Sequence, residues 1–336
     1  MKLLKTIVTG LLGCIGLAGN HCYAQLGFDL KVDKPEPYDE RTLRAEKTGD
    51  KPLKASKRFL QNLTTHYNYY FNANNKLNDV IEGAKASFKD DYGSLLPFYN
   101  YTLDATSQST TELDSVIYKA KTGIVMHDLR SDWADNMYTL WGAAYYFEKK
   151  FDSASLMFQF INYSFAEKEK DGYYRYIGSR LDGNNALSIS SKENRKFPKS
   201  LVTAPSRNAA FLWQARTLIE LDQMAEAGSM IATLSNDPLF PKRLYTELEE
   251  IKAFWFYKQN IWDSAAFHLQ NAYDQASNKQ ERARWEYLTA QMLEKKGDLT
   301  GAQRWYAKAI QHTTDPVMEV YARLNLVRSN KEGGEN

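Results

Sequence analysis

Residues 290–309 read AQMLEKKGDLTGAQRWYAKA, and the pattern in this stretch decides the fold. Gly297 interrupts a helical pattern and predicts a turn between two helices. Ala290 and Ala302 stand twelve residues apart, one in each predicted helix. Two antiparallel helices pack at the short end of the usual range of about 8–10 Å only where small side chains face each other. The stretch therefore predicts a close helical hairpin.

Three further pairs of small residues repeat this spacing: Ala253 and Ala265, Ala215 and Ala227, and Gly142 and Ala154. The turn position between the two members of each pair holds Asn260, Asp222 and Lys149, of which only the lysine misfits a tight turn. Repeated helical hairpins of about 34 residues are typical of tetratricopeptide (TPR) arrays. We expect an all-α fold, a TPR-like α-solenoid of helical hairpins with one long loop insertion, rather than a set of unrelated amphipathic helices.

The chain divides into six predicted segments: a signal peptide (1–24), an extended N-terminal arm (25–56), N-terminal helical hairpins with the first repeat (57–164), a Tyr- and Gly-rich loop insertion (165–205), three C-terminal repeats (206–329) and a tail (330–336). The N-terminal hairpins are expected to begin with helices over 59–71 and 76–88, which the asparagine-rich residues 72–75 separate. A loop as long as the insertion, without helical periodicity, is usually functional or disordered.

The first 24 residues have the pattern of a secretory leader. Lys2 and Lys5 precede an apolar run over 6–19, which is too short to span a bilayer. Small residues at the end of the leader favour cleavage after Ala24. The alternative is lipidation at Cys14, because the preceding residues resemble a lipobox, although the apolar run continues past this cysteine. Both routes predict an exported protein.

Composition limits the chemistry of the exported body. Cys14 and Cys22 both lie in the leader, so the body has neither a disulfide nor a thiol nucleophile. Removing Lys2 and Lys5 lowers the Lys+Arg count from 43 to 41, equal to the 41 acidic residues, and this neutral balance argues against nucleic-acid binding. No metal-pair spacing of histidines, phosphate-binding glycine loop or serine-hydrolase motif occurs. We therefore expect no catalytic residue, metal or cofactor.

Two groups of residues are candidates for partner binding. The first group lies in the insertion and consists of Tyr173, Tyr174, Arg175, Tyr176, Arg180 and Asp182. Tyrosine and arginine are enriched at interface hot spots. The second group lies beside the first predicted hairpin and consists of Asn62, Tyr67, Asn68, Asn72 and Asn74. A structural role is the alternative for each group: the tyrosines pin the loop to the solenoid, and the asparagines cap helices and turn the chain.

Three short stretches carry a resemblance to a known family: NLTTHYNYYFNA over 62–73, DDY and LLP within 90–97, and SDWAD over 131–135. Over residues 57–310 the chain resembles the TPR-containing PorW/SprE family of the Bacteroidota, which is associated with the type IX secretion system and gliding motility. The resemblance implies a periplasmic component at the outer membrane that links the secretion translocon to a periplasmic ring. The chain is shorter than many members, and its lipobox is poorer than that of the lipoprotein members.

From the repeats and the resemblance together we expect a non-enzymatic scaffold or adaptor of the type IX apparatus, with translocon and ring proteins as partners. Binding would use a concave solenoid face and the tyrosine-rich loop. Membrane association would be indirect, or would occur through a lipid on Cys14. The alternative function is glycan capture at the outer membrane, because the chain holds seven tryptophans whose rings can stack on sugars.

Overall fold

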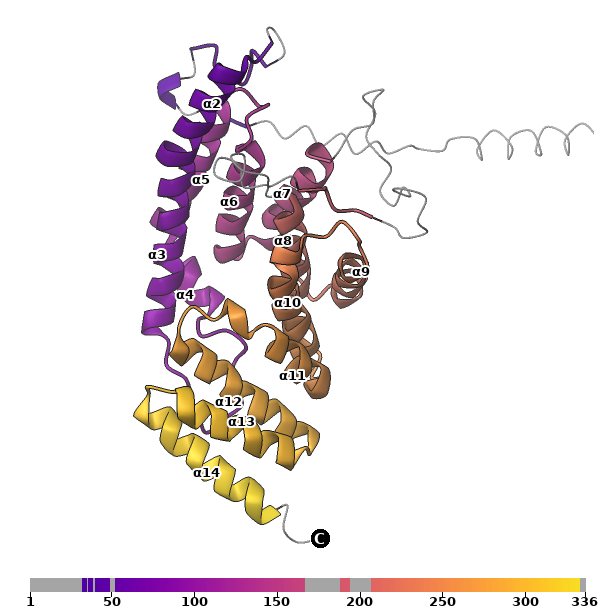
Figure 1. The fold of residues 1–336 in the computed structure, drawn as a ribbon. Coiled ribbons are helices and arrows are strands. Elements are labelled where there is room, and N and C mark those ends of the chain that lie inside the picture. Colours follow the sequence, from indigo (N-terminus) through magenta and orange to yellow (C-terminus); the bar gives the residue numbers. More distant parts are fainter. Residues whose placement is uncertain are drawn as a thin grey trace, which may run out of the picture. The chain divides into compact units, whose positions relative to one another are not determined.

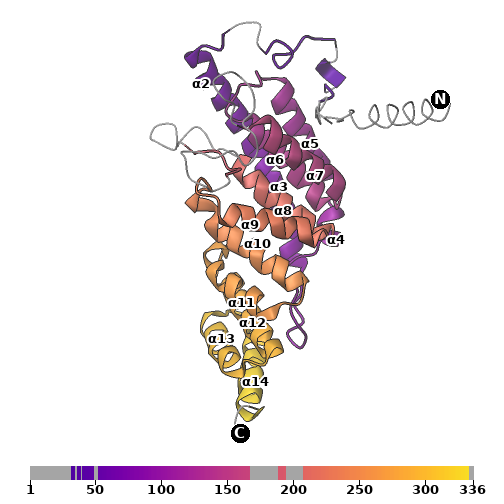
Figure 2. The same ribbon diagram turned by 90° about the vertical axis from the view of Figure 1, so that its right-hand side faces the viewer.

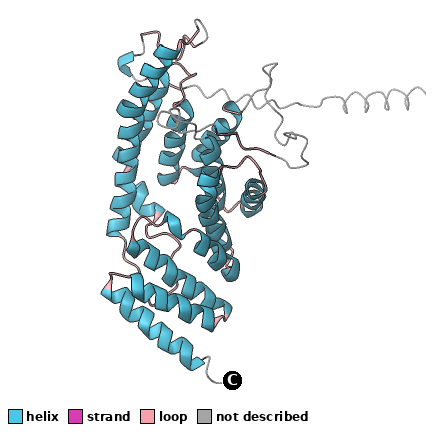
Figure 3. Ribbon diagram, in the orientation of Figure 1, coloured by secondary structure: helices cyan, strands magenta, loops and turns pink. Residues whose placement is uncertain are grey.

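The computed structural model describes residues 32–34, 36–38, 40–48, 52–166, 188–193 and 207–332. Within these ranges the regular elements are helices, and no strand occurs (Figure 3). The predicted all-α fold is therefore confirmed for the described part of the chain.

Four consecutive helix pairs coincide with the four predicted hairpins (Figure 1). They are α6 (Ala134–Phe147) with α7 (Phe151–Ser164), α8 (Arg207–Glu220) with α9 (Met224–Ser235), α10 (Tyr245–Lys258) with α11 (Trp262–Asn271), and α12 (Lys279–Lys296) with α13 (Leu299–His312). The seven alanines of the predicted small-residue pairs are all fully buried. A Cβ atom on Gly142 would lie 2.7 Å from Cε1 of Phe158, so the two helices of the first pair are too close for any larger residue. Small residues at the crossings thus set the close packing that the sequence predicts.

The turns inside the four pairs share one backbone conformation. Gly297, Asn260 and Asp222 have φ angles of 92°, 60° and 60°, in the left-handed region. Lys149, which misfits the pattern by residue type, takes the same conformation with φ at 62°. A left-handed backbone costs a residue with a Cβ atom roughly 1–2 kcal/mol. The packing of the helix pair therefore overrides the local preference of this lysine.

The N-terminal helices correct one prediction. Helix α2 (Ala55–Thr64), the π-helical turn η2 (Thr65–Tyr70) and α3 (Phe71–Ser87) follow each other without a break, so residues 55–87 form one long helix and not a hairpin. The predicted turn at 72–75 lies inside α3 because the apolar period continues through it, with Ala73 and Leu77 buried one turn apart. Asn72 is accommodated by donating its side-chain amide to the carbonyl of Asn68 one turn earlier, at 2.9 Å.

Helices α4 (Leu103–Ser107), α5 (Thr110–Val125) and α14 (Pro316–Glu332) complete the α-helical elements of the described ranges. Short helical turns are η1 (Glu36–Tyr38), η4 (Lys242–Leu244) and η5 (Tyr273–Gln275). Helix α5 packs against α3 and α6, and α13 packs against α14. The long first helix is thereby joined to the hairpins through α5.

Two segments predicted as an arm and a loop are partly held by the helices. Residues 40–48 of the predicted arm lie at the end of α5, where the amide of Ala45 donates to the carbonyl of Val125 at 3.3 Å. Residues 188–193 of the predicted insertion are held by the carboxylate of Asp237, which accepts from Ser188, Ile189 and Ser190 at 2.6–2.8 Å. These parts have fixed positions because buried polar groups bind them.

Candidate binding surfaces

The segment that joins α3 to α4, residues 88–102, is non-helical and is named the connector. It runs beside α12 (Figure 1), whose Arg284 is only 3% exposed. The guanidinium of Arg284 donates twice to the carboxylate of Asp90, at 2.8 Å each. It also donates to the backbone carbonyls of residues 97–99, at distances from 2.7 to 3.2 Å. One buried arginine thus binds the connector at two separate places.

Other side chains of the C-terminal hairpins bind the connector backbone in the same way. Gln291 of α12 donates to the carbonyl of Ser94 at 2.6 Å and accepts from the amide of Leu96 at 3.0 Å. Tyr257 of α10 donates to the carbonyl of Leu96 at 2.8 Å. Backbone hydrogen bonds combined with buried side chains are how proteins recognise extended peptides. Across α10 and α12 the chain therefore binds its own peptide.

A cavity of about 560 Å³ lies between the connector and the hairpins. Its aromatic lining residues are Phe98, Tyr99, Tyr101, Tyr146, Phe151, Phe254 and Tyr257. Burial raises the pKa of Tyr146 well above its ordinary value, so this hydroxyl stays protonated. The charged lining residues pair with one another, Lys149 with Asp104 at 2.5 Å and Lys258 with Glu220 at 3.1 Å. The cavity therefore has aromatic walls and a charge-balanced rim.

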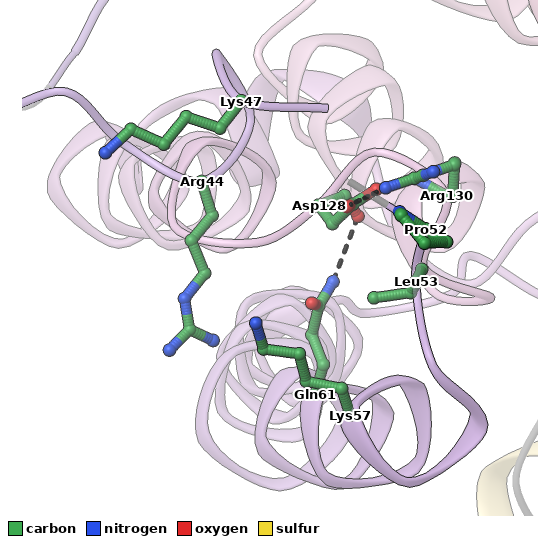
Figure 4. A pocket seen from close by; sticks show the side chains of 8 residues that line it. All are labelled: Arg44, Lys47, Pro52, Leu53, Lys57, Gln61, Asp128 and Arg130. Atoms are coloured by element: carbon green, nitrogen blue, oxygen red, sulfur yellow. Dashed lines mark hydrogen bonds and ion pairs between the residues drawn. The ribbon is translucent and has the colours of Figure 1, made fainter. Parts of the chain in front are cut away.

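A second cavity, of about 450 Å³, has a basic lining (Figure 4). Asp128 is its one carboxylate, and the guanidinium of Arg130 binds it at 2.6 and 2.8 Å. This hydrogen bonding lowers the pKa of Asp128. The side chains of Arg44, Lys47 and Lys57 are exposed and form no ion pair with any described residue. We name Arg44, Lys47 and Lys57 the basic pocket; its excess of positive charge favours acidic groups.

The outer side of the long first helix is apolar, and no described segment covers it. Phe59, Leu60, Leu63, Tyr67 and Phe71 are between 43% and 61% exposed, and we name them the outer stripe. Monomeric proteins rarely expose large apolar side chains together, and such patches mark interaction sites. The outer stripe is therefore a candidate surface for a protein partner.

The π-helical turn keeps the outer stripe straight. Phe59, Leu63, Tyr67 and Phe71 recur every four residues. In an ideal α-helix each four-residue step advances about 40° beyond a full turn, so such a row drifts around the helix. The wider turn at Thr65–Tyr70 takes up this excess. The four side chains consequently stay on one side, away from the buried Gln61, Asn62 and Thr65.

The predicted asparagine group separates into two parts. Asn62 is 3% exposed and faces inward, where its amide donates to Asp132 at 2.7 Å and its carbonyl oxygen accepts from the Ser131 hydroxyl at 3.0 Å. Tyr67 belongs to the outer stripe, and Asn68 and Asn72 are exposed.

The remaining member of the group, Asn74, is partly buried inside α3. Neither Asn72 nor Asn74 caps a helix or turns the chain, so that interpretation is wrong. Asn62 has a structural role, and Tyr67 is the member of the group with an exposed apolar surface.

Histidines stabilise the inner side of the same helix. His66 stacks on Trp133 with ring centroids 4.3 Å apart, and His127 meets the ring edge of Tyr69 at 5.5 Å. His127 Nδ1 also lies 2.8 Å from the carbonyl of Gly123. Burial lowers the pKa of both His66 and His127, which favours neutral rings. These histidines are packing residues.

Other sequence-predicted positions lie outside the described residues, namely Cys14 and the group of Tyr173, Tyr174, Arg175, Tyr176, Arg180 and Asp182. All seven tryptophans lie within the described ranges, and each is buried or partly buried. In the same ranges no cluster of three or more His, Cys, Asp or Glu side chains has the geometry of a metal site. No helix described by the structure combines the length and the apolar character needed to cross a membrane.

The outer stripe and the basic pocket were not predicted from the sequence. The signal for the stripe was the four-residue spacing of large apolar side chains, which predicts a helix but leaves open which of its faces is buried. The basic pocket brings together Arg44 and Lys57, which sequence reasoning assigned to different segments. Its residues carry no motif of their own.

Comparison with known proteins adds no family assignment. The sequence matches no protein-family model, and a search among curated proteins found no similar protein.

Proposed function

We propose that the protein is a non-enzymatic scaffold or adaptor of the type IX secretion and gliding machinery, which binds partner proteins through the outer stripe. The observation that carries this proposal is the row of five exposed large apolar side chains on the first helix. Burial of such side chains is the main source of free energy in protein association. The sequence resemblance over 57–310 supplies the biological setting of the proposal.

The neighbouring charges indicate what such a partner brings. Lys57 precedes Leu60 by three residues, so the basic pocket adjoins the outer stripe on one helix. A partner segment with apolar residues along its length and acidic residues at one end would complement both. Rim charges of this kind chiefly speed association and set the orientation of the partner.

The location in the cell is part of the proposal. The leader would direct export, with cleavage after Ala24 preferred to lipidation at Cys14, and the exported chain would act in the periplasm at the outer membrane. Partners would be proteins of the translocon and of the periplasmic ring. The tyrosine group around Tyr173 stays a prediction for a second contact.

The test is affinity purification from envelope fractions of the producing bacterium. The wild-type chain is compared with a variant of the outer stripe, L63S/F71S, and with a control variant, R304A/Q311A, at exposed positions of α13. We expect recovery of translocon and ring proteins with the wild type and the control, and a loss of at least about tenfold with the stripe variant. Circular dichroism checks that all three keep the same helicity.

Three outcomes would contradict the proposal. Equal recovery with all three chains would exclude the outer stripe as the contact. Recovery of unrelated proteins would exclude the type IX setting. Failure to recover any partner, together with measurable oligosaccharide binding by the purified chain, would favour glycan capture.

A further inference from the structure

The cavity of about 560 Å³ between the connector and the hairpins is separate from the outer stripe, and we name it the aromatic cavity. Its volume lies in the range of about 300–1,000 Å³ that is typical of small-molecule sites. Among its lining rings, those of Phe98, Tyr146 and Phe254 are buried, whereas those of Tyr101 and Phe151 are partly exposed. The aromatic cavity therefore has a closed aromatic floor and aromatic walls that a ligand can reach.

The rim of the aromatic cavity is positioned by the fold. Asp104 at its edge belongs to α4, which lies beside the hairpin helices in Figure 2 and packs against α6. In the same short helix the buried hydroxyl of Thr106 donates to the carbonyl of Phe147 at 2.9 Å. This contact holds α4 near the turn that follows α6, where Asp104 pairs with Lys149 at 2.5 Å. The polar groups of the rim are thus held in place by packing between helices.

Lys149 is the one turn residue of the four hairpins whose type misfits its conformation. The corresponding turns use Asp222, Asn260 and Gly297, which adopt a left-handed backbone at lower cost. A lysine brings no advantage to the turn itself, yet it lies among the residues that line the aromatic cavity. Residues held in a costly backbone conformation are frequent at functional sites. The position of Lys149 therefore indicates a binding role for its ammonium group.

The charged groups of the rim indicate what kind of ligand fits. The ammonium groups of Lys149 and Lys258 pair with the carboxylates of Asp104 and Glu220 at 2.5 and 3.1 Å, so the rim has no net charge. A purely apolar ligand would remove water from these four groups without replacing its hydrogen bonds. A ligand with several hydroxyl groups suits the rim better, because a hydroxyl both donates to a carboxylate and accepts from an ammonium group.

The wall of the aromatic cavity also has unused hydrogen-bonding capacity. The hydroxyl of Tyr99, a lining residue, is buried and has no hydrogen-bond partner among the described residues. Nε of Arg216 is in the same state, and the guanidinium of Arg216 lies 6.0 Å from the centroid of the Tyr99 ring. Buried polar groups without a partner are rare in folded proteins because they are costly. A ligand hydroxyl that reaches Tyr99 relieves part of this cost.

We propose that the aromatic cavity binds one ring of a neutral saccharide. A sugar ring carries C–H groups on its faces, which stack on the negative faces of aromatic rings, and hydroxyl groups around its edge, which reach the rim. The ring of a phenylalanine, tyrosine or tryptophan from a partner peptide would also stack, but it brings at most one polar group to the four charged groups of the rim. The inference is independent of the proposed adaptor role, because the aromatic cavity and the outer stripe share no residue.

The first experiment measures saccharide binding by the purified chain. Maltose, cellobiose, lactose and chitobiose are the neutral probes, and N-acetyltyrosinamide represents an aromatic peptide side chain. Saturation-transfer NMR detects binding, and calorimetric titration gives the dissociation constants. We expect at least one disaccharide to bind with a Kd of about 1 mM or lower, and more tightly than the tyrosine derivative. Binding of none of the four disaccharides, or tighter binding of the tyrosine derivative, overturns the proposal.

The second experiment tests whether the saccharide binds in the aromatic cavity. K149G removes the ammonium group from the rim and places a glycine at a left-handed position, so the folded chain should be at least as stable as the wild type. The matched control is N260G, which makes the same backbone change at the turn after α10, outside the cavity lining. We expect K149G to bind the disaccharide at least about threefold more weakly, and N260G to bind it like the wild type. Equal binding by K149G and the wild type, or an equal loss in both variants, overturns the assignment to this cavity.

Discussion

The connector and the outer stripe are both rich in aromatic and leucine side chains, yet the folded chain treats them in opposite ways. In the connector, Leu96 and Phe98 are buried, and Arg284 and Gln291 bind the surrounding backbone. In the outer stripe the comparable side chains are about half exposed and nothing described covers them. Aromatic content alone therefore does not mark an interaction surface. The two regions differ in whether other residues of the same chain cover their apolar side chains.

Because of this difference, substitutions in the connector are expected to act on stability, and substitutions in the outer stripe on partner binding. Contacts of the connector join residues almost two hundred positions apart, as Asp90 and Arg284 show. Such contacts are lost when the chain unfolds, so substitutions there should lower the free energy of unfolding. Substitutions in the outer stripe should lower that free energy less and act mainly on partner binding.

The largest effect is expected for R284A. The substitution leaves the carboxylate of Asp90 buried without its cation and removes the donor from three carbonyls of the connector. Breaking a buried ion pair in this way costs about 3–5 kcal/mol. Urea unfolding measures the loss. The control is R304A at an exposed position of α13, whose free energy of unfolding should lie within about 0.5 kcal/mol of the wild type. Equal losses in the two variants would mean that the connector contributes little to the fold.

The inner side of the first helix is tested by G123A. A Cβ at Gly123 of α5 would lie 2.6 Å from Cε of Met137 and 3.1 Å from Cβ of Tyr69. Met137 can rotate away, but Tyr69 is restrained next to its backbone, so we expect a loss of about 1–3 kcal/mol. The matched control is G83A in α3, where a Cβ meets nothing within 4 Å and the helix gains about 0.5–1 kcal/mol. If G123A and G83A change the free energy of unfolding in the same direction, the close approach of α5 to the first helix does not restrict the residue at position 123.

The hairpins could be predicted from the sequence because their cause is local. Small residues twelve positions apart, such as Ala290 and Ala302, sit on both sides of one turn, and the packing they allow needs no information from elsewhere in the chain. At 72–75 the asparagine-rich composition predicts a turn, but Ala73 and Leu77 continue the helical period and are buried in α3. Periodicity was the stronger signal.

The binding surfaces could not be predicted in the same way. Their definition depends on which faces remain uncovered after distant segments have packed. The docking of the connector requires Arg284, which no local pattern connects to Asp90. The outer stripe becomes a surface only because α5 packs on the opposite side of the first helix.

A smaller effect on the free energy of unfolding is expected from a change in pH. Burial lowers the pKa of His66 and His127 beside the first helix. Histidines of the unfolded chain have pKa values of about 6.5, so the unfolded chain binds protons more readily than the folded one. The stability that the neutral rings contribute is present above the pKa of unfolded histidine. It is lost as the pH falls from there through the lowered pKa values of the folded chain. Urea unfolding at several pH values should show the decline, and H127N should show less of it. An unchanged pH profile in H127N would assign the decline to other groups.

The smallest effect on stability is expected for L63S/F71S in the outer stripe. Both side chains are about half exposed in the folded chain, so their replacement removes only part of their apolar area from burial, and the free energy of unfolding should fall by about 1 kcal/mol. Urea unfolding of this variant beside G123A compares the outer and inner sides of one helix directly. A loss as large as that of G123A would show that the stripe packs within the folded chain. A loss of about 1 kcal/mol or less, combined with lost partner recovery, would show that its apolar side chains are kept for binding.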